Sequence, residues 1–398
     1  MFASRFDSLP PSPFPRLTAL LADDAPGETP VDMAIGEPKH APPEFVKTIL
    51  DAHFSEYTRY PPALGSAELR TAIAAWTDRR YATGELVDPE RNIVPLCGTR
   101  EGLFSIALLT VPEWSGGRRN AVLIPNPFYQ CYATAAVAAG AEPVYLPTRR
   151  ETGFLPDLDR LDNDLLQRTS LVYLCSPANP QGTVASPAYL EQLIGLAREH
   201  QFTVLFDECY SEIYLDTPPT GGLEIAAGLG AGLANILIFN SLSKRSSLAG
   251  MRSGFCIGDG DIVTSFLKFR NLSAPQLAYP VQAASAAAWN DEDHVHRNRT
   301  LYQEKIRSAE TILGDNFGFY PPPGGFFLWL DMSACGGGVE AARTLWRKTG
   351  IRILPGTYLA RDEGSSHDPY EKFVRIALVH DLETCNDVLR RMTAALVA

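Results

Sequence analysis

The chain has 398 residues, of which 45% are hydrophobic and 20% are charged, and its formal net charge is -11. This composition is typical of a globular protein, the length favours two domains, and the acidic balance argues against general binding to nucleic acid or anionic membranes. The seven cysteines are scattered without a CxxC pair, so the sequence predicts neither a disulfide framework nor a zinc site. The proline-rich start does not resemble an export signal, and no apolar run approaches the ~18 residues of a membrane span. We therefore expect a cytoplasmic protein with reduced thiols.

The first two thirds of the chain alternate between helical and strand patterns. A short helix is expected near 15–22, and helical periodicity covers 66–81, where Leu69, Ile73 and Trp76 share one face. The later apolar runs that predict strands lie at 93–96, 121–124, 170–174, 203–206, 236–239 and 255–257, with helices near 100–110, 129–140 and 187–200. Strands that are buried on both faces and joined by helices predict a mostly parallel α/β sheet.

The pattern changes near residue 276. Helical segments cover 276–290 and 297–314, and strands at 326–330 and 373–378 then mix with helices, as in a smaller α+β domain. We therefore expect a large domain at 41–290 and a small C-terminal domain at 291–398, with the boundary at the long helix.

Polar residues follow the predicted strands at the points where the strands end. Because ligands of open α/β sheets collect at the carboxyl ends of strands, we expect these side chains to line one site. In chain order they are Gly98, Thr99, Arg100, Tyr129, Asn179, Asp207, Tyr210, Ser241, Ser243 and Lys244. Each alone has a plainer role as a helix cap, a turn, a core aromatic or a solvated lysine, but their occurrence together at one edge favours a ligand site.

These residue types match pyridoxal phosphate (PLP) chemistry. A lysine amine forms a Schiff base with the cofactor aldehyde, and an aspartate pairs with the pyridine nitrogen so that the ring accepts electrons. Lys244 and Asp207 are the candidates for these two roles. Arg252 follows Lys244 and suits the cofactor phosphate, because a guanidinium fork matches phosphate geometry. The freed Lys244 amine could then carry the proton between substrate and cofactor.

At these residues the chain resembles the class I and II aminotransferases of PLP fold type I, over nearly its full length. The matching motifs are SLSK at 241–244, SPANPQGT at 176–183, FDECY at 206–210, YPPALGSAELR at 60–70, IGEP at 35–38 and VRIALV at 374–379. The resemblance implies a large PLP-binding domain, with a mostly parallel seven-stranded sheet between helices, and a smaller α+β domain. It also implies that residues 1–40 pack with the small domain.

The resemblance assigns roles to individual residues. Lys244, Asp207 and Tyr210 would be catalytic, and Asn179 and Tyr210 would bind the ring oxygen while Tyr129 stacks on the ring. The residues around the phosphate would be Gly98, Thr99, Arg100, Ser241, Ser243, Arg252 and, in a homodimer, Tyr60 of the partner subunit. The α-carboxylate of an amino acid or 2-oxo acid would be bound by Arg375, Asn179 and Gly36.

A narrower resemblance concerns the substrate. IGEPKH at 35–40, NPFYQCY at 126–132, SLSKRSSLAGMRSGF at 241–255 and LPGTYLAR at 354–361 are similar to the proteobacterial succinyldiaminopimelate transaminases. That family moves an amino group between glutamate and an N-succinylated keto-pimelate in a ping-pong reaction of lysine biosynthesis. Lys39, Arg100 and Arg245 are candidates for the distal carboxylates. The chain departs from that family at 270–282 and at Phe327, where a tyrosine is common.

The sequence leaves other functions open. The nearest are an aspartate, aromatic or kynurenine aminotransferase and a PLP carbon–sulfur lyase. A non-enzymatic aminotransferase-like binding protein is disfavoured by the presence of Lys244, Asp207 and Arg375. No GxGxxG follows the first strand, which argues against a Rossmann dehydrogenase. His294 and His296 lack an acidic third ligand at useful spacing, so we expect no metal.

Overall fold

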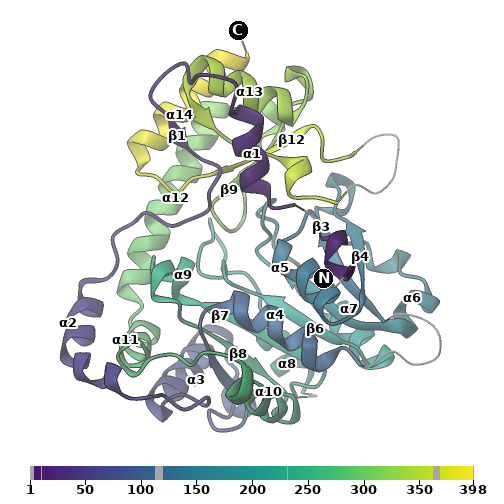
Figure 1. The fold of residues 1–398 in the computed structure, drawn as a ribbon, viewed down its shortest axis with the longest axis vertical. Coiled ribbons are helices and arrows are strands. Elements are labelled where there is room, and N and C mark those ends of the chain that lie inside the picture. The colour runs from purple at the N-terminus through teal and green to yellow at the C-terminus, as the bar shows by residue number, and fades with distance from the viewer. Residues whose placement is uncertain (1–3, 10, 113–119, 231, 362–367, 398) are drawn as a thin grey trace.

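The computed structural model describes residues 4–9, 11–112, 120–230, 232–361 and 368–397. Its central feature is a seven-stranded sheet with the order β2-β8-β7-β6-β5-β3-β4 (Figure 1). Its strands are β2 (Ile93–Leu96), β3 (Ala121–Asn126), β4 (Glu142–Pro147), β5 (Thr169–Cys175), β6 (Thr203–Asp207), β7 (Ile236–Ser241) and β8 (Gly254–Gly258). β8 is antiparallel to both its neighbours, and the other pairs are parallel. The predicted mostly parallel seven-stranded sheet is confirmed.

Strand β4 was not predicted, and its position in the sheet explains why. It lies at the edge, pairs only with β3, and carries Pro143 and Pro147. Prolines are tolerated at an edge because one side of the strand needs no ladder hydrogen bonds, but they remove the strand signal from the sequence.

Helices cover both faces of the sheet, because the central strands bury side chains on both. Val204 and Phe206 of β6 join one apolar layer, whereas Leu205 joins the opposite one. The first layer is covered by α3 (Ala67–Tyr81), α7 (Pro187–His200), α8 (Gly222–Leu229) and α11 (Tyr279–Asn290), and the second by α4 (Thr99–Thr110), α5 (Gln130–Ala138) and α10 (Gly260–Ser273). The further helices of this part are α2 (Glu44–Ala52), α6 (Asn163–Arg168) and α9 (Leu242–Arg245).

A second, smaller core lies around an antiparallel sheet with the order β11-β12-β9. Its strands are β9 (Phe327–Asp331), β11 (Leu354–Pro355) and β12 (Phe373–Ala377), and its helices are α13 (Gly338–Thr349) and α14 (Leu382–Leu396). The N-terminal segment packs here. β1 (Val31–Asp32) pairs in parallel with β10 (Ile351–Arg352), and α1 (Pro13–Leu21) contributes Leu17 and Leu21 to an apolar cluster with Leu354 and Phe373 (Figure 1).

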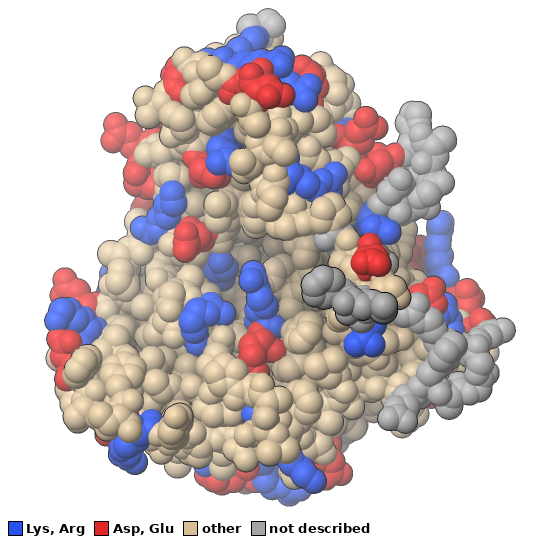
Figure 2. Space-filling view, viewed as in Figure 1, with Lys and Arg blue, Asp and Glu red and all other residues tan. Residues whose placement is uncertain are grey.

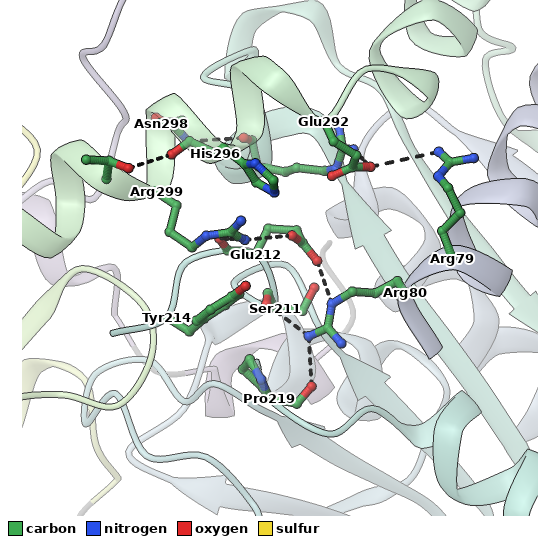
Figure 3. Close-up of polar contacts among 12 residues, drawn as sticks. Arg79, Arg80, Ser211, Glu212, Tyr214, Pro219, Glu292, His296, Asn298 and Arg299 are labelled. Atoms are coloured by element: carbon green, nitrogen blue, oxygen red, sulfur yellow. Dashed lines mark hydrogen bonds and ion pairs between the residues drawn. The ribbon is translucent and has the colours of Figure 1, made fainter. Parts of the chain in front are cut away.

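The long helix α12 (Asp293–Leu313) runs alongside both parts of the molecule (Figure 1). Near its N-terminal end, Arg299 forms an ion pair with Glu212 of the segment after β6, with 3.2 Å between Nη1 and Oε2. The other carboxylate oxygen of Glu212 accepts a 2.8 Å bond from Nε of Arg80 on α3 (Figure 3). Glu212 is only 4% exposed, so its carboxylate joins α3, α12 and the segment after β6 in a contact that is largely shielded from solvent.

The parallel strands end at one edge, which brings polar residues together. Cys175, Asp207 and Phe239 lie opposite one another on β5, β6 and β7. The segments that follow these strands therefore start at the same level, with Lys244 on the short helix α9 directly after β7.

Candidate active site

A cavity of about 450 Å³ opens at this edge, between the seven-stranded sheet and the smaller sheet. Figure 2 shows the molecular surface hollowed between these two parts, with basic side chains along the hollow. The predicted site residues that line the cavity are Gly36, Thr99, Arg100, Tyr129, Asn179, Asp207, Tyr210, Ser241, Ser243, Lys244, Arg252 and Arg375. Residues that the sequence places far apart are thus brought around one space.

Lys244 is held by the turn that follows β7. Ser241 begins α9, and its hydroxyl accepts a 2.9 Å hydrogen bond from the N–H of Ser243. The Nζ of Lys244 donates to the carbonyl oxygen of Gly36 at 2.5 Å. Burial lowers the pKa of Lys244 to about 8. More neutral amine is therefore present near neutral pH than an exposed lysine would supply, which favours a nucleophilic role.

Asp207 ends β6 as a buried carboxylate with fixed partners. The Tyr132 hydroxyl donates to Oδ2 at 2.7 Å, and the N–H of Cys209 donates to Oδ1 at 3.4 Å. Burial raises the pKa of Asp207, and these hydrogen bonds oppose that rise. Tyr132 was not predicted as a site residue. Its sequence signal is its place in NPFYQCY, three residues after Tyr129, which immediately precedes α5; both tyrosines line the cavity.

Arg252 and Gly98 form a close pair at the start of α4. The Arg252 guanidinium donates to the carbonyls of Ala249 at 3.0 Å and of Cys97 at 3.3 Å. Gly98 has a φ of +82°, and a Cβ at that position would lie 2.2 Å from Nη2 of Arg252. Only glycine permits this approach, which places a cation beside the free N–H groups of the helix start. Cations and N–H groups in this arrangement suit a phosphate.

Tyr129 lies beside Arg100 on the cavity wall. Nε of Arg100 donates to the Tyr129 hydroxyl, and burial raises the pKa of Tyr129 to about 12. The phenol is therefore neutral at physiological pH, and Arg100 keeps its charge for another anion.

Arg375 is a buried cation on β12. Nη1 donates to Oδ1 of Asn179 at 2.9 Å, Nη2 donates to the carbonyl of Ala34 at 2.6 Å, and the guanidinium lies 4.4 Å from the ring centre of Phe327. Burial lowers its pKa to about 10, which still leaves it charged at neutral pH. In the described part of the chain no carboxylate pairs with Arg375, and its Nε has no hydrogen-bond partner. A buried cation with unused donors is a site for a carboxylate ligand.

Apart from Gly98, three predicted residues lie outside the cavity lining. Tyr60 is fully exposed on this single chain, and Lys39 is bonded to His380 with 2.9 Å between Nζ and Nε2. Arg245 is buried, and its Nη2 lies 2.7 Å from Oε1 of Glu292. The prediction that Arg245 binds a distal carboxylate is wrong, because adjacent helical residues point in different directions and, of these two neighbours, Lys244 lines the cavity whereas Arg245 does not.

The predicted site residues fit PLP. Thr99, Ser243 and Arg252 supply donors for a phosphate at one end of the cavity, Asp207 supplies a carboxylate for a pyridine nitrogen, and Lys244 supplies an amine for an aldehyde. In the described ranges, no group of three or more His, Cys, Asp or Glu side chains could hold a metal ion. None of the described helices is both long and apolar enough to cross a membrane.

Comparisons with known proteins agree with this arrangement. Residues 28–392 match the family model of aminotransferase class I and II. An LL-diaminopimelate aminotransferase of Dehalococcoides mccartyi is 29% identical over 364 residues, which are 89% of this chain and 90% of that protein. The crystal structure of an aminotransferase from Neisseria meningitidis is 39% identical, with a TM-score of 0.94 and coverage of 99% of this chain and 100% of that one. A probable N-succinyldiaminopimelate aminotransferase from Thermus thermophilus is 25% identical, with a TM-score of 0.84 and coverage of 97% and 100%.

The family model spans most of the chain, and the predicted PLP fold type I is confirmed. The cavity holds the lysine, carboxylate and arginine that the cofactor needs. The chain belongs to the class I and II aminotransferases and is a PLP-dependent aminotransferase.

Proposed function

We propose that this aminotransferase exchanges an amino group between N-succinyl-LL-diaminopimelate and 2-oxoglutarate. The observation that carries the proposal is the charge of the cavity. Of the described residues that line it, four are cationic and one is a carboxylate: Arg100, Lys244, Arg252, Arg375 and Asp207.

This charge balance distinguishes a succinylated substrate from a free diamino acid. The distal end of free LL-diaminopimelate carries an ammonium group beside its carboxylate, and the single carboxylate of the described lining, Asp207, is already engaged by Tyr132 and cannot pair with that ammonium. A buried ammonium beside cations is unfavourable. Succinylation replaces that ammonium by an amide and adds a carboxylate, which Arg100 can attract. The apolar lining residues Phe14, Phe154 and Leu155 suit the methylene chain between the two ends.

The chain's own residues position the reacting groups. When bound, PLP supplies an aldehyde and an electron-accepting ring. Lys244 would hold the aldehyde carbon, and its freed amine would carry the proton between substrate and cofactor. Asp207, oriented by Tyr132, would keep a proton on the pyridine nitrogen.

The remaining residues bind and orient the two ligands. Arg252, Thr99 and Ser243 would hold the phosphate with Ser241 and the backbone at Gly98, and Tyr129 would stack on the ring, which leaves Arg100 for the distal carboxylate. Tyr210 and Asn179 would bind the ring oxygen. Arg375 binds the substrate α-carboxylate through its unused donors, with Asn179 and Gly36 beside it.

The proposal includes a homodimer in the cytoplasm. Tyr60 is fully exposed and lies near the exposed aromatic residues Phe54 and Tyr57 in the sequence. In the dimer, Tyr60 of the partner subunit would reach the phosphate. The seven cysteines are free thiols, as expected in a reducing compartment.

The second candidate substrate is free LL-diaminopimelate, favoured by the likeness to the 29% identical LL-diaminopimelate aminotransferase. The test is a series of half-reactions with the PLP-loaded enzyme, followed by the absorbance of the cofactor. The amino donors are N-succinyl-LL-diaminopimelate, LL-diaminopimelate, aspartate, phenylalanine, kynurenine and cystathionine.

We expect kcat/KM for the succinylated substrate to exceed that for LL-diaminopimelate by at least ~10-fold, since burying the distal ammonium among cations, with no counter-charge from the lining, costs more than about 1.4 kcal/mol. A preference for LL-diaminopimelate would establish the second candidate instead. Turnover confined to aspartate, an aromatic acid or kynurenine, or release of a thiol from cystathionine, would contradict both. Lys244→Ala should abolish every half-reaction, whereas the exposed Lys268→Ala should leave them unchanged.

A further inference from the structure

A chain of polar side chains lies behind Lys244, outside the cavity lining. Nζ of Lys305 on α12 lies 2.6 Å from Nε2 of His40, and Nδ1 of His40 lies 2.6 Å from Oδ1 of Asn298. Nδ2 of Asn298 then donates to the carbonyls of both Lys244 and Arg245, at 3.0 Å each. Three elements thus meet at the turn that carries the reactive lysine: the N-terminal segment, α12 and α9.

The direction of every hydrogen bond in this chain is determined by its ends. Carbonyl oxygens only accept, so the Asn298 amide nitrogen must face the turn and its Oδ1 must face His40. Nδ1 of His40 must then carry a proton and donate it. A Lys305 ammonium group has only donors, so Nε2 of His40 must accept. Both ends therefore require the same state, a neutral His40 protonated on Nδ1.

Lys305 is buried, unlike a typical lysine, which lies at the protein surface. It is 2% exposed, and none of the ion pairs between described residues involves it. Its other bond goes to the carbonyl of Leu378 at 3.3 Å, directly after the strand that carries Arg375. The chain thus links the substrate-binding strand to the Lys244 turn.

We propose that Lys305, His40 and Asn298 act together as positioning residues that hold the backbone of the Lys244 turn, and so fix the Nζ of Lys244 against the cofactor. This positioning role rests on the proposed function of Lys244 as the lysine that holds the cofactor. The chain depends on a neutral His40, because protonation of Nε2 would place a second cation against Lys305.

Burial favours the required protonation state of His40. Burial and the charge of Lys305 hold the pKa of His40 below its usual value, although the Asn298 bond acts in the opposite direction. Burial also lowers the pKa of Lys305 to about 8. The other titratable groups that face the pair are Tyr302, Asp381, Cys385 and Glu304. The chain should therefore be intact at neutral pH and break in acid.

The test compares variants of the PLP-loaded enzyme without substrate. Asn298→Asp keeps the acceptor but removes both donors to the turn, and His40→Leu removes the link to Lys305. His40→Gln retains one acceptor and one donor, and the exposed His296→Leu is the matched control. Two quantities are measured: the pH titration of the cofactor absorbance, which reports the pKa of the Lys244 nitrogen, and the separate values of kcat and KM.

For Asn298→Asp and His40→Leu we expect the titration midpoint to rise by about one unit, because a loosened turn lets the nitrogen sample more hydrated positions. We expect kcat to fall roughly 10-fold and KM to change by less than about threefold, since misplacement of a reacting atom mainly affects the chemical step. His40→Gln and His296→Leu should remain near the wild type. Unchanged titrations in both disruptive variants, with only a lower melting temperature, would show that the chain is merely structural.

A measurement on the wild-type enzyme covers the case in which the variants fail to fold. Selective ¹⁵N labelling of histidine should show His40 neutral with its proton on Nδ1. A proton on Nε2, or a doubly protonated ring at neutral pH, would overturn the proposal. Failure of this proposal can be distinguished from failure of the proposed function. Cofactor absorbance that does not depend on Lys244 would refute the role of Lys244, whereas the tautomer of His40 would be unaffected.

Discussion

At the residue scale, the proposed substrate site depends on Arg375. Its guanidinium is buried against Phe327, two of its nitrogens bond to Asn179 and Ala34, and its Nε has no partner in the described ranges. A substrate carboxylate would satisfy the remaining donors and offset the cost of the buried charge.

The first prediction concerns the guanidinium fork. Arg375→Lys keeps the charge but cannot bind a carboxylate through two parallel bonds, so kcat/KM for the amino acid should fall about 100-fold. The dissociation constant of PLP, measured by fluorescence, should remain within about threefold of the wild type. Equal losses in both quantities would mean that Arg375 does not serve the substrate.

The second prediction concerns the Tyr132–Asp207 bond. This bond favours the ionised carboxylate, so Tyr132→Phe should raise the pKa of Asp207 further and move the acid limb of the kcat profile to higher pH. The control is Tyr173→Phe. Tyr173 stacks on Tyr132, but this variant removes a hydrogen bond to the Leu103 carbonyl and leaves the Tyr132–Asp207 bond in place. An acid limb that moves equally in both variants would contradict the role of Tyr132.

At the element scale, the proposed phosphate site depends on how α4 begins. Gly98 precedes the helix with φ +82° and lets the Arg252 guanidinium lie against the backbone. The helix start thereby combines free N–H groups with a cation.

The third prediction separates this close approach from backbone strain. Gly98→Ala should weaken PLP binding by roughly 10-fold or more, because its Cβ displaces Arg252 and one charge-assisted bond is lost. Gly140→Ala introduces a Cβ at nearly the same φ, +78°, and among the described residues other than its two chain neighbours no heavy atom lies within 4 Å of it. It should cost about 1–2 kcal/mol of stability and leave PLP affinity unchanged. The two affinities are measured by titration of PLP into the cofactor-free protein.

Much of the fold and of the site could be predicted from the sequence, for identifiable reasons. Strands such as β6 bury both faces, so they appear as continuous apolar runs, and their ends mark the site residues. Strand β4 could not be predicted, because an edge strand tolerates prolines and these remove the strand pattern from the sequence. The chain from Lys305 to Asn298 could not be predicted, because its members come from distant segments and no local pattern specifies such contacts. Tyr132 stands close to Tyr129 in NPFYQCY, but that motif does not reveal its bond to Asp207 of β6. Arg245 was misassigned because sequence proximity to Lys244 does not determine which way a side chain points.

At the scale of the whole molecule, the two parts are held by charges as well as by apolar packing. Glu212 lies between Arg80 of α3 and Arg299 of α12, with both arginines largely buried (Figure 3). The division of the chain at 41–290 and 291–398 stays a prediction, but this carboxylate lies where the long helix meets the larger part.

The fourth prediction tests this contact. Glu212→Gln leaves two guanidinium groups without their counter-charge and should lower the free energy of unfolding by about 3 kcal/mol. The control is Asp216→Asn, since Asp216 pairs with Arg307 of the same helix on the exposed surface and should cost less than about 1 kcal/mol. Both values come from urea denaturation of the PLP-loaded protein. Equal costs would show that Glu212 is no more important than a surface charge.

The most direct measurement of the central claim is chemical. The PLP-loaded enzyme is reduced with borohydride, digested, and analysed by mass spectrometry to find the residue that carries the cofactor. We predict the cofactor mass on the peptide that contains Lys244. A label on Lys305 or on any other lysine, or none, would contradict the account.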